Sequence, residues 1–370
     1  MSQDAPRPYI GGQAVIEGVM MRSPGSLSIV CRRRSGQLVV RERAMPTLAR
    51  GARTWPLVRG VVTVVESLRL GFHAMQWASE FYEQDWGEED KPKPPPPTNI
   101  FTALSLGIIA LVTSSGDPGP ETGSNKGTGA IGLLSILFAI FLFVALPQAG
   151  AEGINRLLNL GLDVQSAPFQ AITGGTKLLI VMGYMLLLRQ AELTRRVFQY
   201  HGAEHKAIST YEAGDELTVA NAAAKTTLHA RCGTTFLVMV ALVSILVFSA
   251  LGSLLPQLPG GRIAQSVGFF FMKLPFLPVI AAITYELQRF FARYCSTGPL
   301  RILLWPGFLV QKITTAEPEP AQLEVALASL QATLWREQAA SSAPAEVPDR
   351  IFPDYGQLLA DPGYATANAR

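Results

Sequence analysis

Long apolar blocks alternate with polar segments along this chain of 370 residues. A helix needs about 20 apolar residues to cross roughly 30 Å of hydrocarbon. The last two of five blocks reach that length, the second is just long enough, and the third qualifies if its helix continues into the polar residues that follow. The blocks are Ile100–Thr113, Ala130–Pro147, Gly174–Leu188, Thr234–Leu255 and Ile263–Tyr285. This pattern predicts a mainly α, polytopic helical membrane protein.

Basic residues set the number of crossings. They are concentrated before residue 87 and again between the third and fourth blocks, whereas the segments after the second and fourth blocks offer only Arg156 and Arg262. Because cytoplasmic segments carry the excess of Lys and Arg, both basic regions should be cytoplasmic, which requires an even number of crossings between them. Four spans satisfy this rule, with 100–113 as an interfacial or re-entrant piece. Alternatively, 100–113 spans and Gly174–Leu188 does not.

The N-terminal part shows two shorter patterns. Ser26–Arg43 places apolar residues on both sides of the polar stretch RRRSGQ, which predicts two short strands joined by a turn. Trp55–Phe81 has apolar residues at steps of three and four, interrupted by Arg59, Glu66 and Arg69. We therefore expect a small cytoplasmic β-hairpin, followed by a helix that lies on the membrane surface or docks against the spans.

Composition divides the chain into five parts. A proline-rich run cannot form helix or strand and separates the N-terminal part from the apolar blocks. Beyond the last block, a proline followed by an amphipathic pattern predicts a helix that packs back on the cytoplasmic part, and an Ala-, Ser- and Pro-rich end is expected to be flexible. The expected parts are the hairpin and interfacial helix 1–86, the linker 87–98, the transmembrane domain 99–300 with a cytoplasmic loop 192–233, the cytoplasmic helix 301–337 and the flexible tail 338–370.

The overall composition limits the kinds of partner that the protein is expected to bind. The chain is 48% hydrophobic and 16% charged, whereas soluble proteins carry nearer a quarter charged residues. Cys31, Cys232 and Cys295 are an odd number at unrelated spacings, which argues against a disulfide framework and fits a reducing compartment. The run 32–34 of three arginines lacks interleaved aromatic residues and is typical of a solvated turn. We therefore expect the lipid bilayer, and no nucleic acid, as a partner.

The chemical signal of the sequence lies at 201–205, HGAEH. His201 and His205 are four residues apart, so on a helix they lie on one face with Cβ atoms about 6 Å apart. With Glu204 they form the inverted zincin pattern His-x-x-Glu-His, in which the histidines hold zinc and the glutamate acts as general base on water. Gly202 counts against an undistorted helix, since glycine there costs about 1 kcal/mol relative to alanine.

Further ligands are offered by LHARCGTTF, where two residues separate His229 and Cys232 at the entry to the fourth block. Four protein ligands would make a closed structural site, whereas three would leave the open position that catalysis needs, and the sequence allows both. Without a metal, His201 and His205 would form a hydrogen-bonded interfacial pair. A thiolate ligand favours zinc among divalent ions.

Four other polar residues stand in apolar surroundings. Gln13 and Glu17 lie in a glycine-flanked run, where Glu17 either faces the metal site or is a solvated acid. Glu286 stands near the cytoplasmic end of the last block, so it either reaches the headgroup level or serves the site. For Lys273, within the same block, we expect snorkelling to the interface.

Several motifs together resemble the bacterial YqhQ-like family of membrane proteins of unknown function, whose members are described as predicted metal-dependent enzymes. The motifs are GGQAVIEGVMMRSP, RRVFQYHGAEHK, LHARCGTTF, LPVIAAITYELQRF and PGFLVQKITTAEPEPAQLEVAL. The resemblance implies an integral protein of the bacterial cytoplasmic membrane with a metal site at His201, His205, His229 and Cys232. It implies no established reaction.

Three functions fit these observations. The first is a zinc hydrolase at the cytoplasmic membrane face, with Glu204 as general base, both termini in the cytoplasm, and a membrane-associated peptide or lipid as substrate. The second is a non-enzymatic scaffold whose closed metal site ties the cytoplasmic loop to the spans. The third is a transporter, because Pro275 and Pro278 interrupt a span, although the sequence shows no internal repeat.

Overall fold

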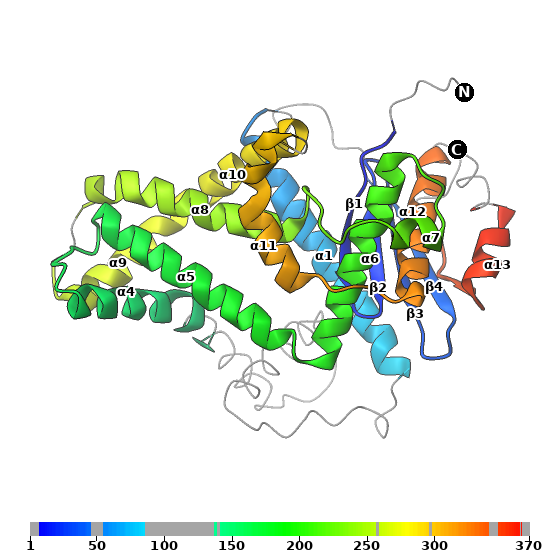
Figure 1. The fold of residues 1–370 in the computed structure, drawn as a ribbon, viewed down its shortest axis with the longest axis horizontal. Helices are drawn as coiled ribbons and strands as arrows, with labels where there is room; N and C mark the ends of the chain where they lie inside the picture. The colour runs from blue at the N-terminus through cyan, green and yellow to red at the C-terminus, as the bar shows by residue number, and fades with distance from the viewer. Residues whose placement is uncertain are drawn as a thin grey trace, which may run out of the picture.

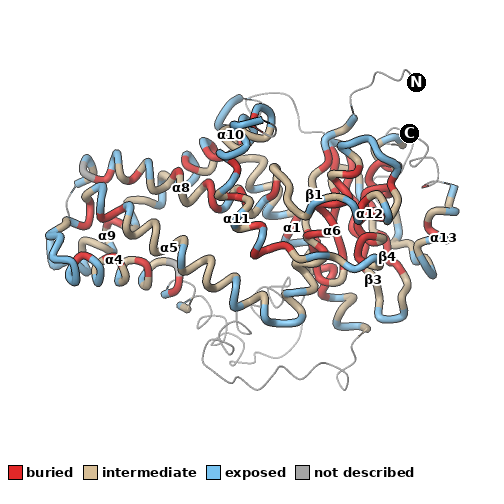
Figure 2. The backbone as a smooth tube through the Cα atoms, viewed as in Figure 1, coloured by how far each residue is buried: buried red, intermediate tan, exposed pale blue. Residues whose placement is uncertain are grey.

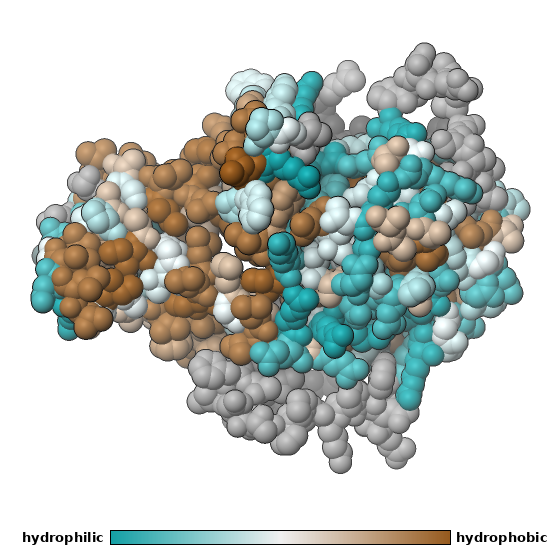
Figure 3. Space-filling model, in the orientation of Figure 1, coloured by the Kyte–Doolittle hydropathy of each residue, from teal (hydrophilic) through white to brown (hydrophobic). Residues whose placement is uncertain are grey.

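The computed structural model describes residues 7–45, 55–85, 137–138, 141–256, 259–295, 298–339, 347–362 and 364. Two halves are evident along the long axis: a polar half built around a β-sheet, and an apolar half of helices (Figures 1 and 3). Most of the buried backbone gathers around the sheet (Figure 2). The expected linker 87–98 and the apolar block 100–113 lie outside the described residues.

The sheet has five antiparallel strands in the order β1-β2-β3-β4-β5. The expected hairpin is present as the β3–β4 pair, in which Val30 lies opposite Val40, and it belongs to this larger sheet. A two-residue turn joins β1 to β2, and Glu17 adopts a positive φ of 51° there. The strands are β1 (Gly11–Val15), β2 (Gly18–Arg22), β3 (Ser26–Arg32), β4 (Leu38–Ala44) and β5 (Arg350–Phe352).

Helices cover both faces of the sheet, which explains why its strands are apolar on both sides. Successive side chains of a strand point to opposite faces, so Val30 packs with α6 (Glu192–Ala213) and α12 (Pro320–Gln338), while Cys31 packs with Trp77 of α1 (Val58–Asp85). The first half of α1 instead docks against α10. Of the two expectations for this helix, docking is the one observed.

The apolar half contains three helical segments long and apolar enough to cross a membrane. They are Ala167–Leu188, Gly233–Leu251 and Arg262–Tyr294. The first is α5 and the second is α8, while the third comprises α9 (Arg262–Lys273), the 3-10 turn η4 (Leu274–Phe276) and α10 (Leu277–Tyr294). Short elements complete this half and its connections: η2 (Phe141–Ala145), α4 (Leu146–Leu157), α7 (Val219–Ala223) and η3 (Gly252–Leu254).

The prediction of a membrane-type helical protein is thus confirmed in its coarse form. Three of the four expected spans have a counterpart among the described residues. The remaining block, Ala130–Pro147, falls largely on residues that the structure does not describe.

The C-terminal part differs from its expectation. The predicted single helix 301–337 is divided into η5 (Pro299–Leu304), α11 (Trp305–Thr314) and α12, and α12 packs on the sheet. The expectation of a flexible tail does not hold for residues that form β5 and α13 (Tyr355–Ala360). The tail supplies apolar side chains for burial, and Leu358 and Tyr364 are fully buried.

Tyr364 closes a buried polar cluster between the sheet and α12. Its hydroxyl donates a hydrogen bond to the carboxylate of Glu42, and Arg336 Nη1 lies 3.7 Å from the other carboxylate oxygen. Glu42 and Arg336 are 3% and 1% exposed. Burial raises the pKa of Glu42, opposed by its hydrogen bond from Tyr364. The cluster ties the tail to the sheet because a buried carboxylate needs its donors.

We predict that Tyr364→Phe lowers the free energy of unfolding by about 1–3 kcal/mol, because Glu42 loses a donor that water cannot replace. Thermal unfolding of the detergent-purified protein measures this loss. Tyr355→Phe is the matched control, since its hydroxyl makes only a 3.5 Å contact with Gln331. Equal melting temperatures for the two variants would show that the tail does not depend on the buried cluster.

Candidate metal centre

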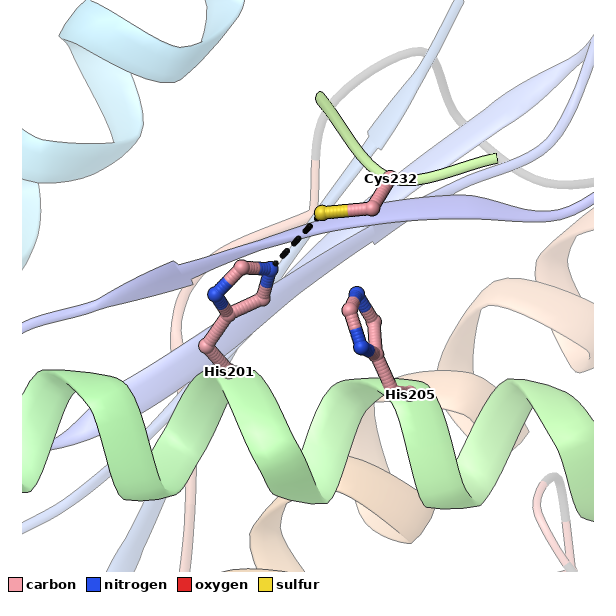
Figure 4. Close-up of side chains that lie close together, drawn as sticks. All are labelled: His201, His205 and Cys232. Carbon is pink, nitrogen blue, oxygen red and sulfur yellow. Dashed lines mark hydrogen bonds between the residues drawn. The ribbon is translucent and has the colours of Figure 1, made fainter. Parts of the chain in front are cut away.

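Three potential metal ligands converge where α6 passes the start of α8. His201 and His205 stand on one side of α6 and point toward Cys232 (Figure 4). One ligand atom from each residue lies within 4.8 Å of the other two. His201 is half-buried, and His205 and Cys232 are buried. Among the predicted ligands, these are the ones that the structure brings together.

Gly202 permits a close backbone contact beside this pair. The helix runs without interruption from Glu192 to Ala213. A Cβ on Gly202 would lie 2.2 Å from the carbonyl oxygen of Ala316, in the connection between α11 and α12. The Ala316 N–H donates to the carbonyl of Phe198 at 2.9 Å. The residue that weakens the helix in isolation therefore allows another segment to dock against it.

Backbone carbonyls orient both imidazoles. His201 Nδ1 lies 2.9 Å from the carbonyl oxygen of Thr314, and His205 Nδ1 lies 2.5 Å from that of Thr227. A carbonyl only accepts, so each Nδ1 carries a proton, and each Nε2 presents a lone pair when its imidazole is in the neutral form that binds metal. His201 Nε2 lies 3.1 Å from Cys232 Sγ. His205 Nε2 is buried and finds no hydrogen-bond partner in the described part of the chain.

Cys232 occupies the N-cap of α8, where the Thr234 N–H points at its sulfur at 3.4 Å. Burial alone would raise the pKa of this thiol, but the charge and hydrogen bond of His201, assisted by His205, hold it well below its usual range. The same pairing raises the pKa of His201 to about 9, although burial opposes this. The sulfur is therefore set up as a thiolate, which is the metal-binding form.

Glu204 is a buried carboxylate on the same helix. A Cβ on Gly12 of β1 would lie 2.8 Å from its Oε1, so the glycine makes room for the acid. Glu204 Oε2 is buried without a hydrogen-bond partner among the residues that are described. Burial raises the pKa of Glu204, opposed by His201 and His205. An unpaired buried carboxylate oxygen is costly, which is typical of a functional group.

His229, the remaining predicted ligand, lies beside the group but outside it. Its ring centroid is 5.6 Å from that of His205, and its Nε2 lies 3.3 Å from a carboxylate oxygen of Glu212. Its backbone is held by the buried side chain of Gln311, which accepts from the His229 N–H and donates to its carbonyl, both at 2.8 Å. The sequence analysis did not single out Gln311. Its amide side chain within an otherwise apolar helix, α11, could have indicated a buried polar contact.

Two of the other acids singled out in the sequence, Glu17 and Glu286, form ion pairs between structural elements. Glu17 pairs with Arg196 at 2.5 and 2.6 Å and accepts from the Tyr200 hydroxyl at 3.2 Å, so it anchors α6 to the β1–β2 turn. Glu286 forms a two-point pair with Arg59 at 2.6 and 2.5 Å, which joins α10 to α1. Both acids thus connect elements.

A cavity of about 2470 Å³ extends from the candidate ligands into the apolar half of the molecule. His201, Glu204, His205 and Cys232 line it together with side chains of α1, α5, α8, α9 and α10. Most of the lining is apolar. The cavity therefore connects these buried polar groups to the apolar half of the molecule.

Comparison with known proteins extends over most of the chain. A family described as "Protein of unknown function (DUF1385)" matches residues 55–336. The "Uncharacterized protein YqhQ" of Bacillus subtilis (strain 168) is 29% identical over 335 residues, which cover 89% of this chain and 93% of that protein. No solved structure matches.

We predict that Gly202→Ala lowers the free energy of unfolding by about 1–3 kcal/mol, because the added methyl group must displace the Ala316 backbone. Thermal unfolding in detergent is again the measurement. Gly183→Ala on α5 is the control, since a methyl group there meets nothing within 4 Å and alanine favours the helix. A Gly202→Ala variant as stable as the control would contradict the close contact.

Proposed function

We propose that this chain, which belongs to the DUF1385 family of proteins of unknown function, is a metal-dependent hydrolase at the cytoplasmic face of the bacterial membrane. The observation that carries this proposal is the convergence of three ligand atoms beside Glu204, a buried carboxylate with one oxygen unpartnered among the described residues. Catalytic zinc sites typically use three protein ligands, whereas structural sites use four.

The donor set suits a divalent metal of the zinc type. Two Nε2 lone pairs and a low-pKa thiolate combine imidazole with a soft sulfur ligand. The hydrogen bonds from each Nδ1 to a backbone carbonyl are the outer contacts that orient metal-binding histidines. When bound, a zinc ion would supply Lewis acidity and activate water for attack.

Glu204 is the proposed general base. Glu204 lines the same cavity as the ligands, so its carboxylate can accept the proton of an attacking water and return it to the leaving group. Gly12 and the sheet exclude solvent from behind the carboxylate. Burial raises the pKa of Glu204, and the charges of His201 and His205 oppose this, which favours the ionised form that accepts a proton.

The apolar cavity supports a membrane-associated lipid or peptide as substrate. We place the site at the cytoplasmic face because the basic segments of the sequence flank it, with four spans and both termini in the cytoplasm. The cavity joins this face to helices that suit the hydrocarbon region. A bound amphiphile would keep its apolar part between the helices while its reacting group meets Glu204.

A structural metal site in a non-enzymatic scaffold is the second candidate. It is favoured by the position of the ligands, since His201 and His205 belong to the sheet half and Cys232 to the start of α8. A metal would then clamp the two halves together. In that case Glu204 would be dispensable, whereas in the hydrolase it is essential.

The purified protein should hold about one zinc ion per chain, and His205→Ala or Cys232→Ala should remove most of it, because each deletes one of three ligands. Elemental analysis gives the metal content, and X-ray absorption should count two nitrogen ligands and one sulfur. His73→Ala, which alters a histidine on α1 outside the cluster, should retain the metal. Metal-free wild-type protein at neutral pH would end both proposals.

Glu204→Gln should keep zinc and thermal stability while product formation falls by about 10²–10⁴-fold, the usual contribution of a general base. Untargeted mass spectrometry of membrane lipids and peptides provides the readout. Cells that express Glu204→Gln should match cells that lack the protein. Profiles that match wild type would instead favour the scaffold.

A further inference from the structure

Two lysines face the cavity from within the apolar helical half. Lys177 lies on α5 and Lys273 ends α9, and both stand inside segments that are long and apolar enough to span a membrane. Both line the cavity. A charged group at such a position is expensive and marks a functional site unless something neutralises it.

Lys273 does not snorkel as the sequence suggested. Its Nζ donates to Oε1 of Gln170 at 2.6 Å and lies over the rings of Phe248 and Phe269, at 4.9 and 4.4 Å from their centroids. These partners are neutral and direct the ammonium across the helices toward α5. Gln170 and Lys177 are seven residues, about two helical turns, apart on α5, so the Lys273 ammonium bonds to the face of α5 that also carries Lys177.

The lysines lack a compensating acid. Among the residues that the structure describes, no carboxylate lies within ion-pair distance of Lys177 or Lys273. Glu152, the acid on the helical wall of the cavity, is already paired with Arg156 at 2.8 Å and Arg262 at 2.7 Å. Within the described part of the chain, two ammonium groups therefore face one low-dielectric cavity without a carboxylate counterion.

Basic side chains also outnumber acidic ones around the whole cavity. The described lining contains the acids Glu152 and Glu204 and the bases Arg22, Arg156, Lys177, Arg231, Arg262, Lys273, Arg289 and Arg293. Low-dielectric walls focus such a charge excess into a positive potential. The cavity therefore favours an anion, and its apolar walls favour an anion that carries an apolar chain.

We propose that Lys177 and Lys273 bind a phosphate-type anion, supplied by the headgroup of an anionic phospholipid whose chains occupy the apolar cavity. Lysine binds phosphate as a point charge, and the oxygens of a single phosphate group can accept hydrogen bonds from two ammonium groups at once. Gln170 positions Lys273, and Phe248 and Phe269 cover its ammonium group.

This site is distinct from the candidate metal centre. Cys232 caps the start of α8, whereas Phe248 beside Lys273 stands near its other end, about 24 Å away at 1.5 Å per residue. The proposed lipid site therefore does not rest on the proposed hydrolysis. Either proposal can fail while the other stands.

The test uses the full chain purified in detergent and native mass spectrometry with added dioleoylphosphatidylglycerol. The double variant Lys177→Met, Lys273→Met should bind this lipid at least about tenfold more weakly than wild type, and each single variant should show a smaller loss. Methionine removes charge from an apolar setting, so the variants should stay folded, which an unchanged or raised melting temperature and an unchanged elution volume in size-exclusion chromatography would verify.

Controls separate charge, chain and free anion. Lys312→Met on the exposed side of α11 removes one charge away from the cavity and should bind the lipid as wild type does. Dioleoylphosphatidylcholine has no net charge. It should bind to wild type more weakly than dioleoylphosphatidylglycerol does, whereas the double variant should bind the two lipids equally. Inorganic phosphate that displaces the anionic lipid from wild type alone would support the lysine site and assign it to the free anion.

Two results would overturn the proposal. One is equal binding of dioleoylphosphatidylglycerol by wild type and by the folded double variant. The other is equal binding of the charged and uncharged lipids by wild type, which would mean that only the chains are recognised.

Discussion

The docking of the segment Thr314–Ala316 against α6 is the contact on which the candidate centre depends. Within three residues, this segment supplies the carbonyl that orients His201, the N–H that bonds to Phe198, and the carbonyl that approaches Gly202. A side chain at position 202 would push the segment away and release the imidazole. One backbone connection thus couples helix packing to the direction of a ligand lone pair.

The candidate centre lies where a polar half and an apolar half of the molecule meet. The sheet half buries its core between α1 on one face and α6 with α12 on the other. The apolar half leaves many large hydrophobic side chains exposed, as a surface for lipid would. His205 and Glu204 come from the first half and Cys232 from the second. Polar atoms buried at such a junction are stable only when they share partners or a bound ion.

The large cavity gives the two proposals a common physical setting. Its walls are mostly apolar, and the charged groups that line it include those of the candidate metal centre and the lysines of α5 and α9. A low dielectric strengthens electrostatic interactions at both places. The cation-rich lining also explains why an anionic amphiphile, rather than a neutral one, would be drawn in.

Much of the outline was predictable from the sequence by itself. Apolar length identified α5, α8 and the α9–α10 segment, because a span must match the hydrocarbon thickness. The four-residue spacing placed His201 and His205 on one face of a helix, and Cys232 at the entry to a span. These are local properties that each segment carries in its own residues.

Only the tertiary structure decided the rest. β5 pairs with β4 across about 300 residues, so no local pattern could reveal that the tail completes the sheet. His229 and Cys232 stand equally near the histidine pair in sequence, yet Glu212 and Gln311 hold His229 aside while the N-cap of α8 points the sulfur inward. Contacts with residues from distant segments determine which side chains come together at the site. Packing of the whole chain decides which residues make those contacts.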